Sequence, residues 1–131
     1  MPQRQELRID GLGEPLSHYT DAVRFGDMLF VSGLVGIDKD LNVIGGDDAA
    51  MQTVQIFENL KLVLNEVNAT FADILKVTVY LTNIDDRSVI NPVRQKYFGS
   101  ARPASTLIQV SKLALPALKV EIEAIVGLSR D

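Results

Sequence analysis

Within residues 73–84, DILKVTVYLTNI, the apolar residues Val77, Val79 and Leu81 alternate with Thr78, Tyr80 and Thr82, which is the spacing of a β-strand with two unlike faces. Residues 27–33, DMLFVSG, form a short unbroken apolar run and predict a strand that is covered on both faces. Residues 18–27 are expected to form its partner strand. The same patterns predict two last strands at 104–113 and 117–128.

A different spacing appears after residue 48, where apolar residues recur every three or four positions. This spacing predicts a helix whose apolar stripe consists of Val54, Phe57, Leu60, Leu64 and Val67. Asp47 or Asp48 is expected to cap the first turn of this helix, and Asn68 to end it.

A second helix is predicted from about Asp86 to Phe98. Pro92 lies within this segment, and a proline is tolerated in a first helical turn because the missing N–H has no partner there. The helix is therefore expected to begin nearer Ile90, or to follow an irregular turn.

The predicted order is β-β-α-β-α-β-β, an α+β fold in which one domain, residues 1–131, has two helices on one face of a single sheet. Residues 28–31 and 107–110, MLFV and LIQV, carry apolar side chains that must also point to the other face. Self-association would cover that second face, whereas the simpler alternative is a mixed face in contact with water.

Composition narrows the classes of partner. The 13 Lys and Arg residues are scattered among 17 Asp and Glu, and the formal charge is −4, so we expect no nucleic-acid partner. No apolar run approaches the roughly 20 residues of a membrane span, and we expect no membrane partner. The first residues, MPQRQELRIDG, contain no apolar segment of a signal peptide, and the chain has no cysteine, so a cytoplasmic protein is expected.

The segment KVEIEAIV, residues 119–126, places Glu121 and Glu123 on the same face of a strand, about 7 Å apart at Cα. If that face is partly buried, desolvation and mutual repulsion raise the pKa of at least one carboxyl and suit it to proton transfer. The alternative is an exposed strand with two solvated glutamates.

Other polar residues have structural alternatives as well. The single histidine, His18, has no second ligand at metal-binding spacing, so we predict no metal site. Tyr19 can face a ligand or pack, and Asn91 lies near Asp85 and Asp86, which are expected to serve as turn and capping groups.

The ordered set of these residues resembles the reactive intermediate deaminase family (Rid, also called YjgF) over roughly residues 15 to 127. The matching residues are Tyr19, Ala22-Val23, Gly26, Phe30-Val31-Ser32-Gly33, Gln55, Asn59-Leu60, Val63-Leu64, Asp73, Lys76 to Leu81, Asn91, Arg102-Pro103-Ala104 and Val120 to Ala124. The resemblance implies a chorismate-mutase-like fold, a homotrimer built around a barrel of sheets, a small-molecule cleft between subunits, and no cofactor.

In the deaminase members of this family, a cleft arginine holds the carboxylate of a 2-imino or enamino acid while water adds to the imine carbon, which releases ammonia and a 2-keto acid. By this resemblance Glu123 positions the water, and Tyr19, Ser32, Gly33 and Asn91 contact the substrate. The chemistry needs only an oriented substrate and an oriented water.

The family's arginine directly follows Pro-Ala, but this chain has Ser105 after Pro103-Ala104. Arg102 stands before the proline, which is a different place on the strand. The resemblance therefore implies a ligand other than the usual 2-imino acid, with Ser105 and Thr106 binding polar groups, and weak or no turnover that Ser105→Arg would raise. The alternative is a non-catalytic trimer that binds a small molecule or has a regulatory role. Some family members carry a ribonuclease name, but the excess of acidic over basic residues argues against nuclease activity in this chain.

Overall fold

The computed structural model describes residues 2–129 of the chain. Its strands are β1 (Gln5–Leu7), β2 (Ala22–Phe25), β3 (Met28–Val35), β4 (Ile74–Leu81), β5 (Ala104–Gln109) and β6 (Val120–Gly127). Its α-helices are α1 (Ala49–Glu66) and α2 (Arg87–Phe98), and two short 3₁₀ helices, η1 (Phe71–Asp73) and η2 (Ile84–Asp86), precede β4 and α2.

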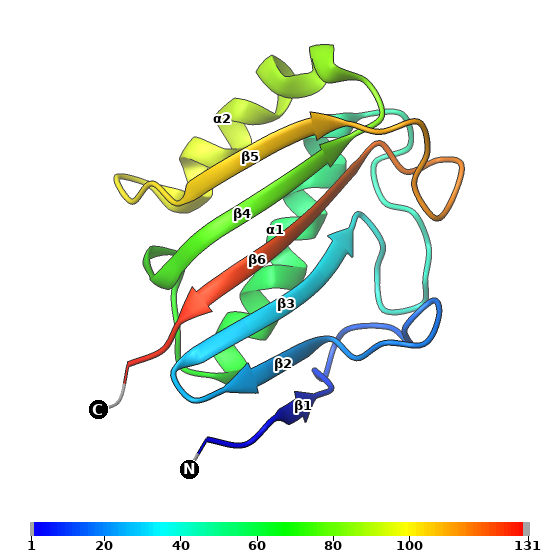
Figure 1. Ribbon diagram of the computed structural model, residues 1–131. Coiled ribbons are helices and arrows are strands. Elements are labelled where there is room, and N and C mark those ends of the chain that lie inside the picture. The colour runs from blue at the N-terminus through cyan, green and yellow to red at the C-terminus, as the bar shows by residue number, and fades with distance from the viewer. Residues whose placement is uncertain (1, 130–131) are drawn as a thin grey trace.

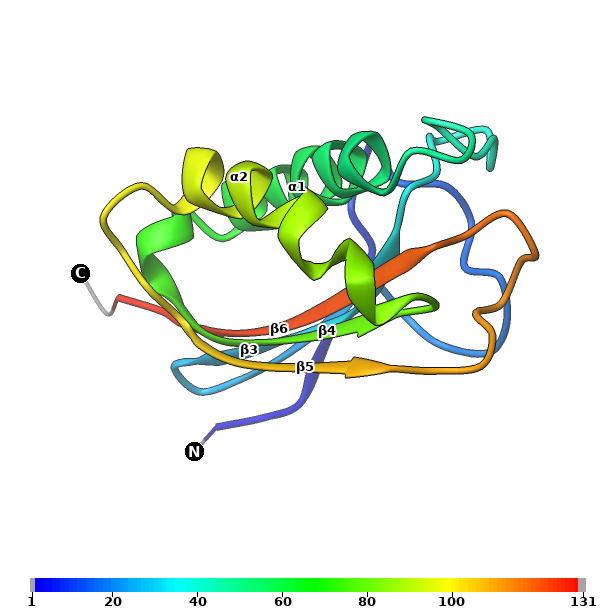
Figure 2. The ribbon, with the colours of Figure 1, turned by 90° about the horizontal axis from the view of Figure 1, so that it is seen from above.

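All strands belong to one sheet in the order β1-β2-β3-β6-β4-β5 (Figure 1). The last strand, β6, runs antiparallel between β3 and β4, while β5 lies parallel to β4 at the far edge. Both helices cover the same face of the sheet (Figure 2). The predicted α+β fold, with two helices on one face, is confirmed.

The additional strand β1 was not predicted from the sequence, because QEL has neither the alternation nor the β-branched residues of a strand. It pairs with β2 through Glu6 opposite Val23. The connection from β2 to β3 is tight, as Gly26 adopts a φ of 61°, a conformation that glycine takes without steric cost.

Helix α1 begins where the sequence predicted, since the Asp48 side chain accepts hydrogen bonds from the backbone N–H groups of Ala50 and Met51. Its buried face is not the predicted stripe throughout: Val54 is 39% exposed, whereas Gln52 is buried. The polar buried residues of α1 are Gln52, Thr53 and Asn59, and all three make hydrogen bonds that satisfy them.

Helix α2 begins at Arg87, so the expectation of a start nearer Ile90 is wrong. Pro92 lies inside the helix instead of in its first turn. The Ser88 residue four positions earlier is exposed, and water can therefore satisfy the carbonyl that a proline leaves without a helical partner. The irregular turn that the sequence offered as the alternative is present as η2, where the Asn83 side chain accepts from the Asp85 N–H.

The face of the sheet opposite the helices has no cover from this chain within residues 2–129 (Figure 2). Large apolar side chains stand exposed there on β3, β4 and β5, with Phe30 46%, Leu75 50% and Ile108 42% exposed. We call this surface the open face. Its apolar character agrees with the prediction that the apolar runs point to both faces.

Candidate functional site

A β-bulge interrupts the pairing of β3 with β6. Val31 pairs with Ala124 and Leu34 with Ile122, so the two residues Ser32 and Gly33 lie opposite the single Glu123. Such a bulge bends the strand and redirects its side chains, and bulges are common beside functional sites. The sequence VSG thus forms an irregular point in the middle of the sheet.

Glu121 lies directly over Gly33. A side-chain β-carbon at position 33 would overlap Glu121 Oε2 and lie 2.8 Å from its carboxyl carbon, so glycine leaves the space that this carboxylate occupies. Burial raises the pKa of the Glu121 carboxyl above its ordinary value, and the neighbouring charge of Glu123 raises it further. The expectation that burial and repulsion would raise the pKa of one of these carboxyls is confirmed.

A pocket of about 270 Å³ surrounds this carboxylate, and we call it the Glu121 pocket. Its lining includes Leu16, Tyr19, Ser32, Gly33, Ala114 and Glu121. The structure therefore brings three of the expected ligand-binding residues, Tyr19, Ser32 and Gly33, together beside a glutamate.

Two hydrogen bonds hold this pocket together. Ser32 Oγ donates to the Thr20 carbonyl over 2.6 Å, which ties the bulge to the loop before β2. Tyr19 Oη accepts from the Leu16 N–H over 3.1 Å, so its own hydroxyl proton remains available to a ligand. Tyr19 lies in a loop and is 44% exposed, so it is not packed in the core of this chain, and its role as a ligand-binding residue stays a prediction.

Glu123, the glutamate expected to position water, does not line the Glu121 pocket. It borders a separate hollow of about 250 Å³ on the open face, together with Phe30, Lys76 and Thr78. The pKa of Tyr80 is raised by burial first and then by the carboxylates of Glu123 and Glu121, which places all three groups near one another. The role predicted for Glu123 stays a prediction, but the carboxylate that lies over Gly33 and shares a pocket with Tyr19 is that of Glu121.

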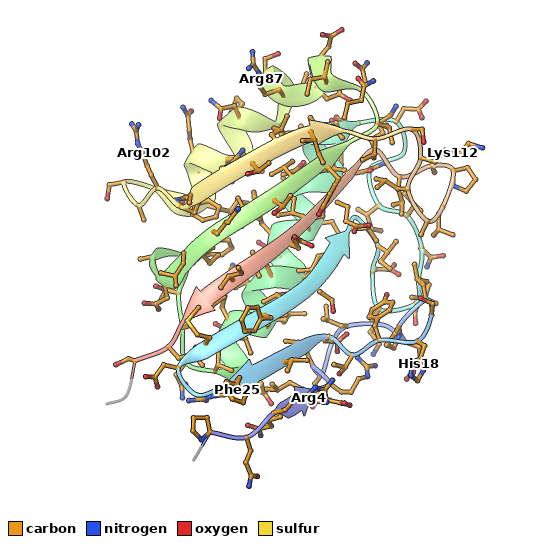
Figure 3. All side chains as sticks on the ribbon, viewed as in Figure 1. Arg4, His18, Phe25, Arg87, Arg102 and Lys112 are labelled. Carbon is orange, nitrogen blue, oxygen red and sulfur yellow. The ribbon has the colours of Figure 1, made fainter. Side chains whose placement is uncertain are left out.

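A larger cleft of about 630 Å³ lies between α2 and the entry to β5, and we call it the Arg94 cleft. Its lining includes Asn91, Arg94, Phe98, Arg102, Pro103 and Ser105. Arg94 Nη2 donates to Ser105 Oγ over 2.9 Å across the cleft wall, and desolvation lowers the pKa of the Arg94 guanidinium. Arg102 borders the same cleft and projects outward from the loop before β5 (Figure 3).

The remaining predicted residue, Thr106, does not share this cleft. Ser105 pairs with the buried Val77 and faces α2, whereas Thr106 pairs with Thr78 on the open face. Sequence reasoning also missed Arg94, although it follows Asn91 by three positions on the same helix and such residues share a helical face.

The Glu121 pocket and the Arg94 cleft lie apart in one chain. The first forms at β3, β6 and the loop before β2, and the second at β5, which ends the sheet on the other side (Figure 1). His18, beside Tyr19, and Arg102 accordingly lie at opposite ends of the molecule in Figure 3. The predicted site residues thus fall into two groups.

Metal ligands and membrane spans concern residues 2–129. Their His, Asp and Glu side chains form no group of three or more that could hold a metal ion, and the metal-free site stays a prediction. None of their helices has the length and apolar character needed to cross a membrane.

The sheet, the bulge and the partly buried glutamate define a two-layer α+β protein with a pocket beside a strand irregularity. A sequence model described as Endoribonuclease L-PSP matches residues 12–128. The chain belongs to this family, which is also the Rid or YjgF family.

Individual relatives agree with this assignment. A RutC family protein of Pyrococcus abyssi is 38% identical over 112 residues, covering 86% of this chain and 87% of that protein. A 2-iminobutanoate/2-iminopropanoate deaminase of Dermatophagoides farinae is 32% identical over 113 residues, covering 86% of this chain and 88% of that protein. The crystal structure of YyfA from Yersinia pestis, of the Rid protein family, superposes with a TM-score of 0.89 at 29% identity, covering 96% of this chain and 100% of that one.

Proposed function

We propose that this protein hydrolyses the imine or enamine of a small metabolite to a carbonyl compound and ammonia. The observation that carries the proposal is the Glu121 pocket, in which a carboxylate with a raised pKa lies over Gly33 and shares the lining with Tyr19. A relative named 2-iminobutanoate/2-iminopropanoate deaminase, 32% identical over most of both chains, supports the reaction class.

The chemistry follows from the groups in the pocket. A protonated imine is already electrophilic, so the protein has to orient the substrate and a water molecule. Glu121 accepts a hydrogen bond from the water and takes up its proton as the oxygen adds to the imine carbon. Glu121 then returns this proton to the nitrogen of the carbinolamine. The C–N bond breaks to release ammonia, and the hydroxyl loses its proton to water as it becomes the carbonyl.

We infer that the complete site forms between copies of the chain, in a homotrimer. The two groups of predicted site residues lie at different parts of one sheet, and the apolar open face needs cover. An association that covers the open face can bring the Glu121 pocket of one copy to the Arg94 cleft of the next.

A non-catalytic trimer that binds or regulates through the same cleft is the second candidate, because Ser105 stands where the family's arginine is expected. The family description contains the word endoribonuclease, but the single histidine and the formal charge of −4 oppose a nuclease function for this chain.

The two β6 glutamates provide a test with a matched control. Glu121→Gln keeps the size of the side chain and removes its proton-accepting carboxylate, and it is expected to abolish keto-acid release from freshly generated 2-iminobutanoate. Glu123→Gln makes the same change two positions along the strand and is expected to retain most of the rate. The reverse result would assign the reaction to Glu123, and equal rates in both variants and wild type would exclude a role for either.

A further inference from the structure

We propose that Arg94 on α2 is the group that binds the carboxylate of the substrate, with Ser105 on β5 holding its guanidinium in position. This inference rests on the proposed hydrolysis and adds the residue that would hold the carboxylate of such a substrate. The contact that motivates it is the 2.9 Å hydrogen bond from Arg94 Nη2 to Ser105 Oγ inside the Arg94 cleft.

Arg94 has unused binding capacity. Its guanidinium carries five N–H donors, and within residues 2–129 its one side-chain hydrogen bond is the one to Ser105. No carboxylate of the described residues forms an ion pair with it, although Arg94 is only partly exposed. Desolvating a cation that has no counter-charge costs free energy, and an anion that binds to it offsets this cost.

The cleft around Arg94 has the charge that an anionic ligand requires. Its lining includes two arginines, Arg94 and Arg102, and neither aspartate nor glutamate, in a chain with a formal charge of −4. A cleft that is lined by charges of one sign and has low-dielectric walls raises the local concentration of oppositely charged ligands. The Phe98 and Pro103 side chains in the wall suit a short carbon skeleton rather than a bare inorganic anion.

Geometry favours Arg94 over Arg102 as the anchor. Arg94 is partly buried and fixed by Ser105, whereas Arg102 is exposed and projects outward (Figure 3). A fixed planar guanidinium can meet a carboxylate with two parallel hydrogen bonds, which a mobile side chain does at a larger entropic cost. Ser105 is small enough to leave the cleft open while its hydroxyl oxygen holds one Nη group.

The test is carboxylate binding, measured without turnover. 2-Oxobutanoate, its methyl ester and inorganic phosphate are titrated into the wild-type protein, Arg94→Gln and Arg87→Gln, with Kd taken from calorimetry. Arg87 is the matched control, because it is an exposed arginine on the same helix and does not line the cleft. Thermal unfolding of each variant confirms that it is folded.

We expect saturable binding of 2-oxobutanoate to wild type, a Kd about ten- to a hundredfold higher in Arg94→Gln, and no change in Arg87→Gln. The ester and phosphate are expected to bind weakly to all three proteins. The double variant Arg94→Ser/Ser105→Arg moves the guanidinium from α2 to β5 within the same contact. It should recover part of the affinity for 2-oxobutanoate.

An unchanged Kd in Arg94→Gln would overturn the assignment, and so would equal affinity for the ester or no saturable binding of 2-oxobutanoate to wild type. Tighter binding of phosphate would show an anion site of a different class and would also overturn it. Carboxylate binding that depends on Arg94 in a protein that releases no keto acid would leave this inference standing and contradict only the proposed hydrolysis.

Discussion

Glu121 on β6 lies directly over Gly33 on β3, with its carboxyl carbon 2.8 Å from the point that a side-chain β-carbon at position 33 would occupy. Even the smallest side chain at position 33 would therefore displace the carboxylate. The glycine of the bulge and the glutamate of the neighbouring strand form one unit, in which the first makes room for the second.

Gly33→Ala should accordingly act through Glu121. Because displacement of a reacting group by about 1 Å can cost roughly a hundredfold in rate, keto-acid release is expected to fall at least about tenfold. Gly127→Ala is the control, since its new β-carbon would meet only the flexible Leu75 side chain, at 3.2 Å, and its rate should match wild type. A wild-type rate in Gly33→Ala would show that the position of Glu121 does not matter.

The raised pKa of Glu121 predicts how the pH affects the stability of a variant. Burial disfavours the ionised carboxyl in the folded protein. The contribution of Glu121 to the stability of the fold is therefore greatest below its ordinary pKa of 4.5, where the carboxyl is neutral, and it is lost as the pH rises through the raised pKa. Glu121→Gln cannot ionise. It should therefore unfold at a higher temperature than wild type at pH 7, and this advantage should disappear below pH 4.5.

Thermal unfolding of wild type and Glu121→Gln, followed by circular dichroism across this pH range, measures the difference. An advantage that persists unchanged into acid would mean that packing, and not ionisation, separates the two proteins.

Gln52 joins the start of α1 to the chain that leads into β6. Its side chain is fully buried, donates to the carbonyls of Gly46 and Ala117 over 2.8 and 2.9 Å, and accepts from the Lys119 N–H over 2.8 Å. Gln52→Leu leaves these three backbone groups without their partner, and we expect it to lower the free energy of unfolding by about 2–4 kcal/mol.

Urea unfolding measures that loss. Gln55→Leu, on the same helix, removes a single hydrogen bond to Asn59 and should lower the free energy of unfolding by less than Gln52→Leu does. Equal losses in the two variants would mean that hydrogen bonding at Gln52 is not what stabilises this junction.

A site shared between copies predicts complementation. Glu121→Gln damages the Glu121 pocket and Arg94→Gln damages the Arg94 cleft, so at a substrate concentration well below the Kd of Arg94→Gln each variant alone should be nearly inactive. When the two are unfolded and refolded together in equal amounts, about a quarter of the sites in random closed trimers combine two intact halves. About a quarter of the wild-type rate should return.

Mixing Glu121→Gln with Gly33→Ala provides the control, because both changes fall in the same pocket and no mixed site is intact. Recovery in that control, or no recovery in the first mixture, would contradict a site formed between copies.

The sequence predicted most of the fold because the strands and helices differ in hydrophobic period. The alternation in β4 and the three-to-four spacing in α1 marked both elements, and Asp48 marked the start of the helix. Strand β1 was not predicted because two of its three residues are polar and only its pairing with β2 makes it a strand. The burial of Gln52 was not predicted because its hydrogen-bond partner Ala117 lies far away along the chain.

Within the candidate site, the residues that are close in sequence were the predictable ones. Ser32-Gly33 and the two glutamates of β6 belong to short sequence motifs. Which glutamate side chain lies over Gly33, however, depends on the register of β6 against β3. The contact of Arg94 with Ser105 joins a helix to an edge strand, and no local pattern predicts it.

Keto-acid release by the wild-type protein tests the central claim most directly. 2-Iminobutanoate is generated in situ from its amino acid by an oxidase, and 2-oxobutanoate is followed with and without the protein at low buffer concentration. Ser105 in place of the family's arginine implied weak or no turnover of this substrate. With Arg94 as the carboxylate anchor, the proposed function instead predicts release faster than in buffer alone, in proportion to the protein added. Release at the buffer rate, by a protein that is folded and associated, would contradict it.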